Sequence, residues 1–349
     1  MWKVEIKKIH KLYEFTDDFI KDMFNWTLVN KGISLTGVQE SIHIKRLYDF
    51  ANECPSLKKH MYELAQCSDI EEVFKMYIEL TENYEAILKR KFEPTIILNE
   101  ETTKTVRKAF EYFYNEALDL KSFWANYKSG EYKSKNDFRN EIGAVRHRCP
   151  YCDIQRTTVA DFTNTDHFLP ISNYPFLGVM WKNLIVSCIA CNTAIKNNVI
   201  NLPILHPFFD SIHDELFFTF TMGTKTIEIN AIDNGFGKEA AENFYKLFHL
   251  DKNYPKLWDV IEREEKDIIR EASRYIKKQS EIEINKGYQE VIEIIDDRQR
   301  NIYSQRAIGE CTKLKLDFYK FYKDYSKSKM KKFMLLEQYG KEVFEEQEV

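Results

Sequence analysis

The chain has no long apolar run at its start. Its first residues, MWKVEIKKIHK, alternate apolar and charged side chains. A signal peptide needs an apolar stretch of about 7 to 15 residues, and a membrane-spanning helix needs roughly 20. The start of the sequence therefore predicts neither, and we expect a cytoplasmic protein with no membrane partner.

The chain also has no excess of positive charge. It contains 51 Lys plus Arg and 55 Asp plus Glu among 349 residues, which gives a formal net charge of -4. Proteins that bind polyanions through their whole surface carry a strong basic excess. Any surface that binds nucleic acid must therefore be local.

A dense cysteine framework is absent as well. Seven cysteines in a chain of this length do not form the even, closely spaced set of a small secreted domain. Cys54, Cys67 and Cys311 are scattered, and we interpret them as small buried apolar residues. The other four occur in two CxxC pairs, CPYC and CIAC.

No GxxxxGK[ST] loop, clear sequence repeat or low-complexity tract occurs in the chain. The first of these absences argues against ATP use within the chain, because that loop cradles the phosphates in P-loop proteins.

After a short strand-like start, helical periodicity dominates residues from about 14 to 128. The clearest apolar stripe runs from 104 to 127, where apolar side chains recur at spacings of three and four. Pro55 and Pro94 mark expected helix ends, because proline lacks the backbone N–H that a helix interior requires. The polar segment 127–137 is an expected linker.

The pattern changes after this segment. Residues 146–205 combine cysteine, asparagine and proline with short β-prone runs, and LFFTFTMGTKTIEI predicts a hairpin around Gly223. Helical periodicity returns from Gly237. We therefore expect an α+β, predominantly helical protein with three parts: an N-terminal helical region (1–128), a zinc module with the following hairpin (129–232) and a C-terminal helical region (233–349).

One late tract, KFYKDYSKSKMKKF at 320–333, interleaves lysine with aromatic residues. This pattern suits contacts with a phosphate backbone and stacked bases. A solvated helix face explains it equally well, because charge runs are common and the acidic end EVFEEQEV offsets this one.

The two CxxC pairs predict a structural zinc site. Each pair lets one short turn direct two thiolates to a point, and together Cys149, Cys152, Cys188 and Cys191 complete a tetrahedral sulfur set. Four protein ligands leave no open position on the metal. Asp166 and His167, which lie between the pairs, are therefore available for a second site.

Phosphodiester hydrolysis requires a general base for water and a hard divalent cation. His167 suits the first need, and the oxygen atoms of Asp166 and Asn192 suit the second. We expect the strand that carries Asp166 and His167 to pair antiparallel with 184–187. A helix opened by the second cysteine pair would then carry Asn192 and Lys196.

The order CPYC, DHFLP, NL, CIACN and K over about residues 146–200 resembles the HNH endonuclease signature, in the four-cysteine form of the ββα-metal superfamily. The resemblance implies a central zinc-bound ββα-metal module flanked by helical regions. It implies that His167 is the general base and that Asn183 braces the loop orienting it. It also implies that Asp166 and Asn192 bind catalytic magnesium or manganese, while the four cysteines hold zinc.

Downstream, LPILHPFFD at 202–210, followed by a hairpin and a helix, is similar to the layout of HNH nucleases in bacterial anti-phage systems of the Septu and retron-associated types. This resemblance implies an effector nuclease that works beside a separate ATPase or regulatory protein. Its substrate would be nucleic acid, with DNA favoured over RNA.

Two basic side chains are candidate phosphate contacts: Lys196, one turn after Asn192, and His147, between two arginines. A solvated side chain is the alternative for His147. Residues 131–200 contain eight Lys or Arg and six Asp or Glu. Because this excess is small, tight binding of nucleic acid would require the flanking helices or a partner.

Two other functions stay open. A zinc-stabilised module that binds nucleic acid or a partner without catalysis would need the cysteines, but not the set Asp166, His167 and Asn192. An interaction or toxin-type protein would use its helical ends. Divalent-metal dependence separates these functions, because cleavage requires the cation and binding does not.

Overall fold

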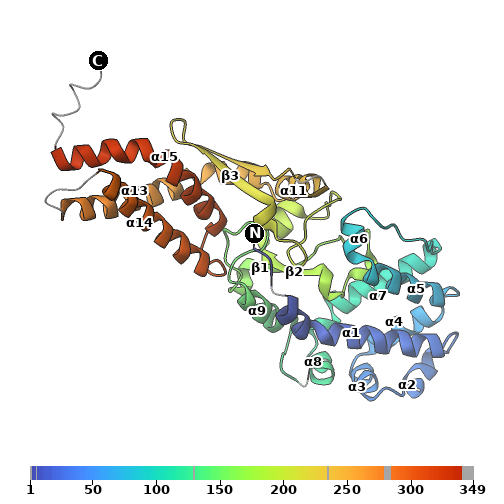
Figure 1. Cartoon of the computed structure of the whole chain (residues 1–349). Helices are drawn as coiled ribbons and strands as arrows, with labels where there is room; N and C mark the ends of the chain where they lie inside the picture. The colour runs from blue at the N-terminus through green and yellow to red at the C-terminus, as the bar shows by residue number, and fades with distance from the viewer. Residues whose placement is uncertain (1, 5, 129, 234–235, 279–283, 340–349) are drawn as a thin grey trace. The chain divides into compact units, whose positions relative to one another are not determined.

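The computed structural model describes residues 2–4, 6–128, 130–233, 236–278 and 284–339. They form two compact units, of which the larger runs from Lys3 to Asp210 and the smaller begins at Ser211 and includes Trp2. Within these residues each unit has one two-stranded sheet, and the remaining regular structure is helical (Figure 1). The prediction of an α+β, mostly helical protein is confirmed.

Helices make up most of the larger unit, and the first begins at Ile6, so the expected strand-like start up to about residue 14 is wrong. The bounds of the helices are α1 Ile6–Val29, α2 Val38–Ser41, α3 Lys45–Glu53, α4 Pro55–Ala65, α5 Ile70–Glu82, α6 Tyr84–Leu88, α7 Glu100–Asn115, α8 Lys121–Tyr127 and α9 Lys135–Val145. Its strands are β1 Thr163–His167 and β2 Leu184–Cys188, followed by a π-helical segment, Ala190–Lys196.

The start of α7 illustrates how the sequence sets these bounds. The Asn99 side chain accepts a hydrogen bond from the Thr102 backbone N–H (2.8 Å), so it caps the helix. Glu100 and Glu101 occupy the first turn, where negative charge interacts favourably with the helix dipole. The strong amphipathic pattern then continues to Asn115.

The expected continuous stripe from 104 to 127 is divided between two helices. The chain leaves helical geometry between Asn115 and Lys121, where it forms a 3-10 turn, Ala117–Asp119. The Trp124 indole N–H donates to the Leu118 carbonyl at 2.8 Å, so this carbonyl has a side-chain donor in place of a helical one. Apolar spacing alone could not show this break, because the buried stripe continues across it.

An aromatic cluster forms the core between α1, α3, α7 and α8. Phe19 lies at its centre, with ring centroids 5.1 Å from Phe113, 5.3 Å from Phe123 and 6.2 Å from Phe50. All four of these side chains are buried. Edge-to-face packing of this kind stabilises a core beyond the area that it buries.

The smaller unit combines a hairpin with helices. Its elements are α10 Ile212–Glu215, β3 Leu216–Thr221, β4 Thr226–Ala231, α11 Phe236–Leu247, α12 Leu250–Asn253, α13 Trp258–Lys277, α14 Ile284–Ser304 and α15 Thr312–Tyr339. The predicted hairpin is confirmed, and the antiparallel register pairs Leu216 with Ala231 and Thr221 with Thr226.

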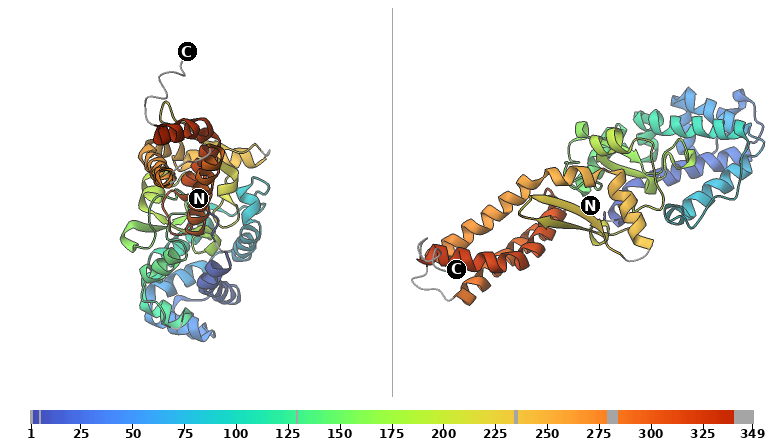
Figure 2. Two further views of the ribbon diagram at one scale, coloured as in Figure 1. Left: turned by 60° about the vertical axis from the view of Figure 1, so that its left-hand side comes forward. Right: turned by 90° about the horizontal axis from the view of Figure 1, so that it is seen from above.

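Strand β3 alternates buried and exposed side chains, as a strand with one covered face should. Its buried face packs on α15, where the Phe220 and Phe318 rings lie 5.6 Å apart. The Phe218 backbone N–H donates to Asp317 at 2.9 Å. Figure 2 shows the hairpin beside the helices of this unit.

The lysine and aromatic tract at 320–333 lies on α15, and its side chains from residue 328 onward are outside the described residues. Tyr322 is buried and donates to Glu265, while Lys323 forms an ion pair with Asp296. These two side chains therefore make contacts within the unit, which neither the nucleic-acid interpretation nor the solvated-face interpretation of the tract predicted.

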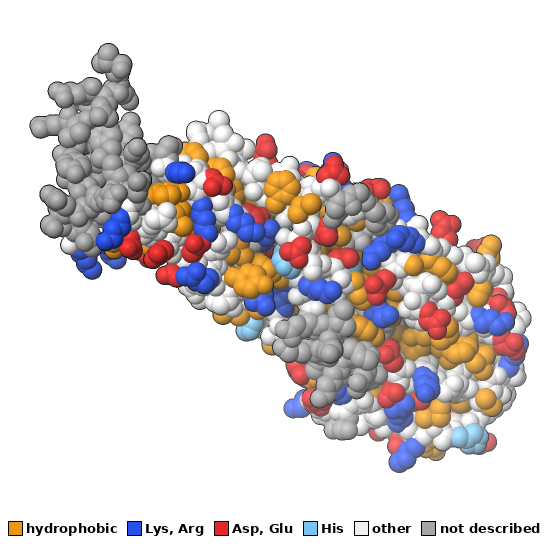
Figure 3. Space-filling model, viewed as in Figure 1, with side chains coloured by type: hydrophobic (Ala, Val, Ile, Leu, Met, Phe, Trp, Pro, Cys, Tyr) orange, Lys and Arg blue, Asp and Glu red, His pale blue; other side chains and the backbone are white. Residues whose placement is uncertain are grey.

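On the face drawn in Figure 3, positive and negative side chains are interspersed over the described surface.

Among the described helices, none combines the length and the apolar character that crossing a bilayer requires. The three-part division at 128/129 and 232/233 stays a prediction.

We expect Phe19→Ala to lower the free energy of unfolding by about 3 to 5 kcal/mol, because it opens a cavity among aromatic rings that cannot collapse fully. Urea unfolding followed by circular dichroism measures this change. Phe162→Ala is the control, since Phe162 is 64% exposed in the same unit and its removal should change stability by less than about 0.5 kcal/mol. Equal effects of the two substitutions would contradict this account of the core.

Candidate functional site

The two strands of the larger unit bring the predicted site residues onto one hairpin. Strands β1 and β2 pair antiparallel, with Asp166 opposite Ile185 and His167 opposite Leu184. The predicted pairing is therefore confirmed, and β1 ends at His167. The predicted helix after the second cysteine pair is also present, with the wider turn of a π-helix: the Asn197 N–H donates to the Asn192 carbonyl at 2.7 Å.

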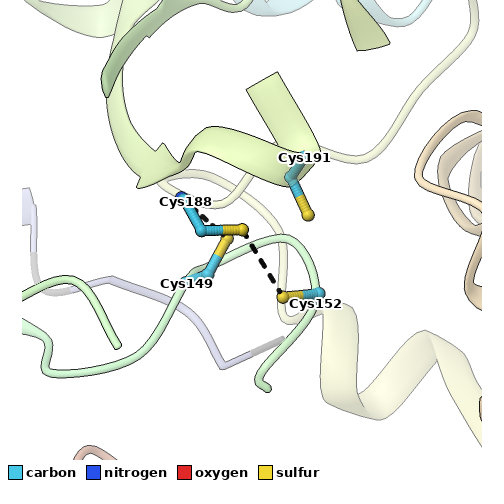
Figure 4. Close-up of side chains that lie close together, drawn as sticks. All are labelled: Cys149, Cys152, Cys188 and Cys191. Carbon is cyan, nitrogen blue, oxygen red and sulfur yellow. Dashed lines mark hydrogen bonds between the residues drawn. The ribbon is translucent and has the colours of Figure 1, made fainter. Parts of the chain in front are cut away.

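The four paired cysteines converge on one point beside the hairpin. Cys149, Cys152, Cys188 and Cys191 are buried, and their sulfur atoms all lie within 4.8 Å of one another (Figure 4). Tetrahedral zinc with Zn–S bonds of about 2.3 Å places its sulfurs roughly 3.8 Å apart. The donor set therefore fits a structural zinc ion, and it would leave no ligand position open.

Backbone groups shape the first cysteine turn. The Asp153 N–H donates to the Cys149 carbonyl at 2.9 Å, and the Cys149 N–H donates to the Gln155 carbonyl at 2.8 Å. The Cys188 N–H points to the Cys149 sulfur at 3.5 Å, an interaction that favours a thiolate. Arg146 and Asp153 form a buried ion pair at 3.1 Å beside the turn.

Asp166 is buried and accepts hydrogen bonds on both carboxylate oxygens. Lys196 Nζ contacts Oδ1 at 3.0 Å, and the Tyr151 hydroxyl donates to Oδ2 at 2.6 Å. Lys196 is buried as well, and its ammonium also donates to the His167 carbonyl at 2.9 Å. A buried carboxylate without partners would be strongly destabilising, and these contacts supply a partner to each oxygen of Asp166.

His167 follows Asp166 as the last residue of β1. Its Nε2 lies 2.8 Å from the Gly178 carbonyl. Because a carbonyl only accepts, Nε2 carries the proton and Nδ1 keeps its lone pair. Burial lowers the pKa of His167, so the ring is neutral near neutral pH. Within the described part of the chain, Nδ1 has no hydrogen-bond partner.

The loop that supplies this carbonyl is held by Asn183. The Asn183 side chain accepts from the Leu169 N–H at 2.7 Å and donates to the carbonyls of Leu169 at 3.0 Å and Leu177 at 3.2 Å. It also accepts from the Tyr84 hydroxyl at 2.8 Å. Since Asn183 is fully buried, its amide connects the two ends of the loop that contacts His167.

The remaining predicted residues are less constrained. Asn192 is half-buried four residues before Lys196, and its side chain makes no hydrogen bond within the described residues. His147 is exposed, and its carbonyl accepts from Thr157 at 3.0 Å. Lys196 would have to leave its buried ion pair to contact a phosphate. These phosphate contacts stay predictions.

Three tyrosines at the site were not among the predicted site residues. Tyr151 lies between the cysteines of the first pair and contacts Asp166, Tyr84 of α6 contacts Asn183, and Tyr114 of α7 packs on His167 with ring centroids 4.4 Å apart. Only Tyr151 has a sequence signal, as the Y of CPYC. The others come from helices far away in the sequence.

Comparison with known proteins gives short similarities only. The chain is 32% identical over 124 residues to protein ea31 of Escherichia phage lambda, covering 31% of this chain and 39% of that protein. It is 39% identical over 46 residues to Septu protein PtuB of Bacillus thuringiensis, covering 13% of this chain and 18% of that protein. The chain thus spans well under half the length of either relative. No family profile and no solved structure matches it.

We expect the purified protein to bind one zinc ion per chain and the Cys188→Ser variant to have a much lower zinc content. The free energy of unfolding of this variant should fall by about 3 kcal/mol or more, because metal binding contributes to folding. Metal analysis and thermal unfolding measure both effects. Cys67→Ser is the control, since Cys67 is a buried thiol outside the cluster. Full zinc content in Cys188→Ser would contradict the assignment of this ligand.

We expect Lys196→Met to destabilise the protein by about 3 to 5 kcal/mol, because it leaves the Asp166 carboxylate buried without its cation. The double variant Asp166→Leu, Lys196→Met should recover most of this loss, as urea unfolding would show. The control is Lys45→Met, which removes an exposed ion pair with Asp49 and should not change the unfolding midpoint. Additive losses in the double variant would contradict coupling within the pair.

Proposed function

We propose that the segment from about residue 146 to 200 is a metal-dependent nuclease module of the HNH type, which hydrolyses phosphodiester bonds. The observation that supports this most directly is the state of His167: a neutral imidazole with Nε2–H on the Gly178 carbonyl and Nδ1 without a partner. A general base needs such a lone pair on a ring of fixed orientation. The adjacent buried carboxylate and the four-thiolate cluster suit the same function.

In this proposal His167 Nδ1 accepts the proton of the attacking water. Asn183 keeps the loop with the Gly178 carbonyl in place, and this carbonyl fixes the tautomer. Asn183 would therefore act on His167 through the hydrogen bonds of this loop.

The oxygen donors Asp166 and Asn192 would hold magnesium or manganese, a hard cation that stabilises charge on the phosphate and the leaving oxygen. Each Asp166 oxygen accepts one hydrogen bond, so lone pairs remain for a cation. The half-buried Asn192 amide has no competing hydrogen bond among the described residues. The donor types fit, although a cation would share Asp166 with Lys196.

The biological setting that we propose is anti-phage defence. The short similarity to a Septu protein supports this setting. DNA is the favoured substrate and RNA the alternative, and a separate ATPase or regulatory protein is the proposed partner. The helical regions on both sides would position the module or bind that partner.

One observation favours a second candidate, a zinc-stabilised module that binds nucleic acid or a partner without cleaving. The Lys196 ammonium lies 3.0 Å from Asp166 Oδ1, where it neutralises the carboxylate that the cation would use. A site arranged in this way can keep its fold without a divalent metal. The two candidates differ in whether turnover depends on that metal.

We expect wild-type protein to cut supercoiled plasmid DNA or structured RNA only when magnesium or manganese is present, and His167→Ala to cut at least about 100-fold more slowly with its zinc retained. Omission of magnesium is the test of metal dependence, because EDTA also strips thiolate-bound zinc. His43→Ala is the control, since His43 is exposed in the segment between α2 and α3.

Cleavage that persists in zinc-loaded His167→Ala would refute the proposed base. Metal-independent binding of either polymer by wild type, with no cleavage at any metal concentration, would favour the non-catalytic module.

A further inference from the structure

Helix α7 brings a side chain against the proposed base. Tyr114, one residue before the end of α7, packs on His167 with ring centroids 4.4 Å apart and planes at 70°, which is edge-to-face geometry. Its hydroxyl donates to the Thr165 carbonyl at 3.4 Å. Thr165 precedes His167 by two residues on β1, so Tyr114 contacts both the strand and the ring that it carries.

Tyr114 is itself held in place by α9. Lys135 Nζ donates to the carbonyls of Tyr114 at 3.2 Å and Asn115 at 3.3 Å, and it forms an ion pair with Asp119 at 3.1 Å. The same ammonium lies 4.8 Å from the centroid of the Tyr114 ring. A cation at these carbonyls stabilises the end of α7, from which Tyr114 projects.

A single hydrogen bond does not fix an imidazole. The bond from Nε2 to the Gly178 carbonyl tolerates a range of angles, so the ring can still rotate partly about its Cβ–Cγ bond, and this rotation changes where Nδ1 points. A second contact on the ring removes this freedom. Within the described residues, Tyr114 supplies the one aromatic contact to His167.

We propose that Tyr114 is a positioning residue for His167: it fixes the plane of the imidazole so that Nε2 keeps its proton on Gly178 and Nδ1 keeps one direction. The catalytic consequence rests on the proposed nuclease function, whereas the effect on the ring does not. The N-terminal helical region would then be part of the active site.

The ring of Tyr114 matters more than its hydroxyl in this proposal. The hydroxyl bond to Thr165 is long at 3.4 Å, and the contact with His167 is made by the ring. Tyr114→Phe should therefore behave like wild type, and Tyr114→Leu should not. Tyr112→Leu is a matched control, because Tyr112 is buried on the same helix but contacts Cys54 and His60.

The first measurement is ¹⁵N NMR of the histidine rings in zinc-loaded, full-length protein, with His167 assigned by comparison with His167→Gln. We expect wild type, Tyr114→Phe and Tyr112→Leu to show one tautomer at His167, protonated on Nε2. Tyr114→Leu should show averaging with the other tautomer. A purely structural role of Tyr114 would leave the His167 signals unchanged in Tyr114→Leu, and that result would overturn the proposal.

The second measurement is the rate of cleavage under conditions in which wild type is active. Tyr114→Leu should lower kcat by about 100-fold with little change in KM, because a misplaced base affects the chemical step more than binding. Tyr114→Phe should stay within about 2-fold of wild type, since the ring contact is retained. Equal kcat in Tyr114→Leu and wild type would overturn the proposal.

The two measurements also separate this proposal from the proposed function. If wild type cuts no substrate, the nuclease proposal fails while the NMR result still decides the role of Tyr114. If Tyr114→Leu does not bind zinc, Tyr114→Met replaces it, because the flexible methionine side chain fills similar space without an aromatic ring.

Discussion

The Asp166 carboxylate is the group on which the arrangement of the hairpin depends, because three separate segments meet at it. Strand β1 carries it, Tyr151 of the first cysteine turn donates to one oxygen, and Lys196 of the π-helical segment donates to the other. Removing a carboxylate and an ammonium from water costs several kcal/mol per ion unless the geometry of the pair is close. The cysteine turn, the strand and the helix therefore have little freedom to shift separately.

Side chains from the helices before the hairpin also contact it. Tyr84 from α6 hydrogen-bonds to the amide that holds the loop after β1, and Tyr114 from α7 packs on the histidine at the end of β1. Both tyrosines and the hairpin lie in one compact unit. In the proposed nuclease, these contacts would couple movement of α6 and α7 to the orientation of His167.

The position of the Lys196 ammonium bears on both candidate functions, because it contacts an oxygen of Asp166 that a catalytic cation would also use. It stabilises the folded hairpin without a divalent metal, and it also neutralises the carboxylate that the proposed cation would bind. A cation and an ammonium can share a carboxylate only by using different lone pairs, at the expense of mutual repulsion. In the proposed nuclease, the affinity for magnesium would thus be linked to the stability of the buried pair.

The sequence by itself determined the local features of this protein. These features depend on residues close together in the chain: CxxC spacing, β-prone runs and helical periodicity. They predicted the helical character, both hairpins and the convergence of the four cysteines Cys149, Cys152, Cys188 and Cys191. Only the tertiary structure decided which side chains reach the site from a distance. Tyr84 and Tyr114 look like ordinary core residues in their helices, because contacts formed across many residues leave no periodic signal. Burial likewise decided that Lys196 neutralises Asp166, since spacing cannot show which charges are removed from water.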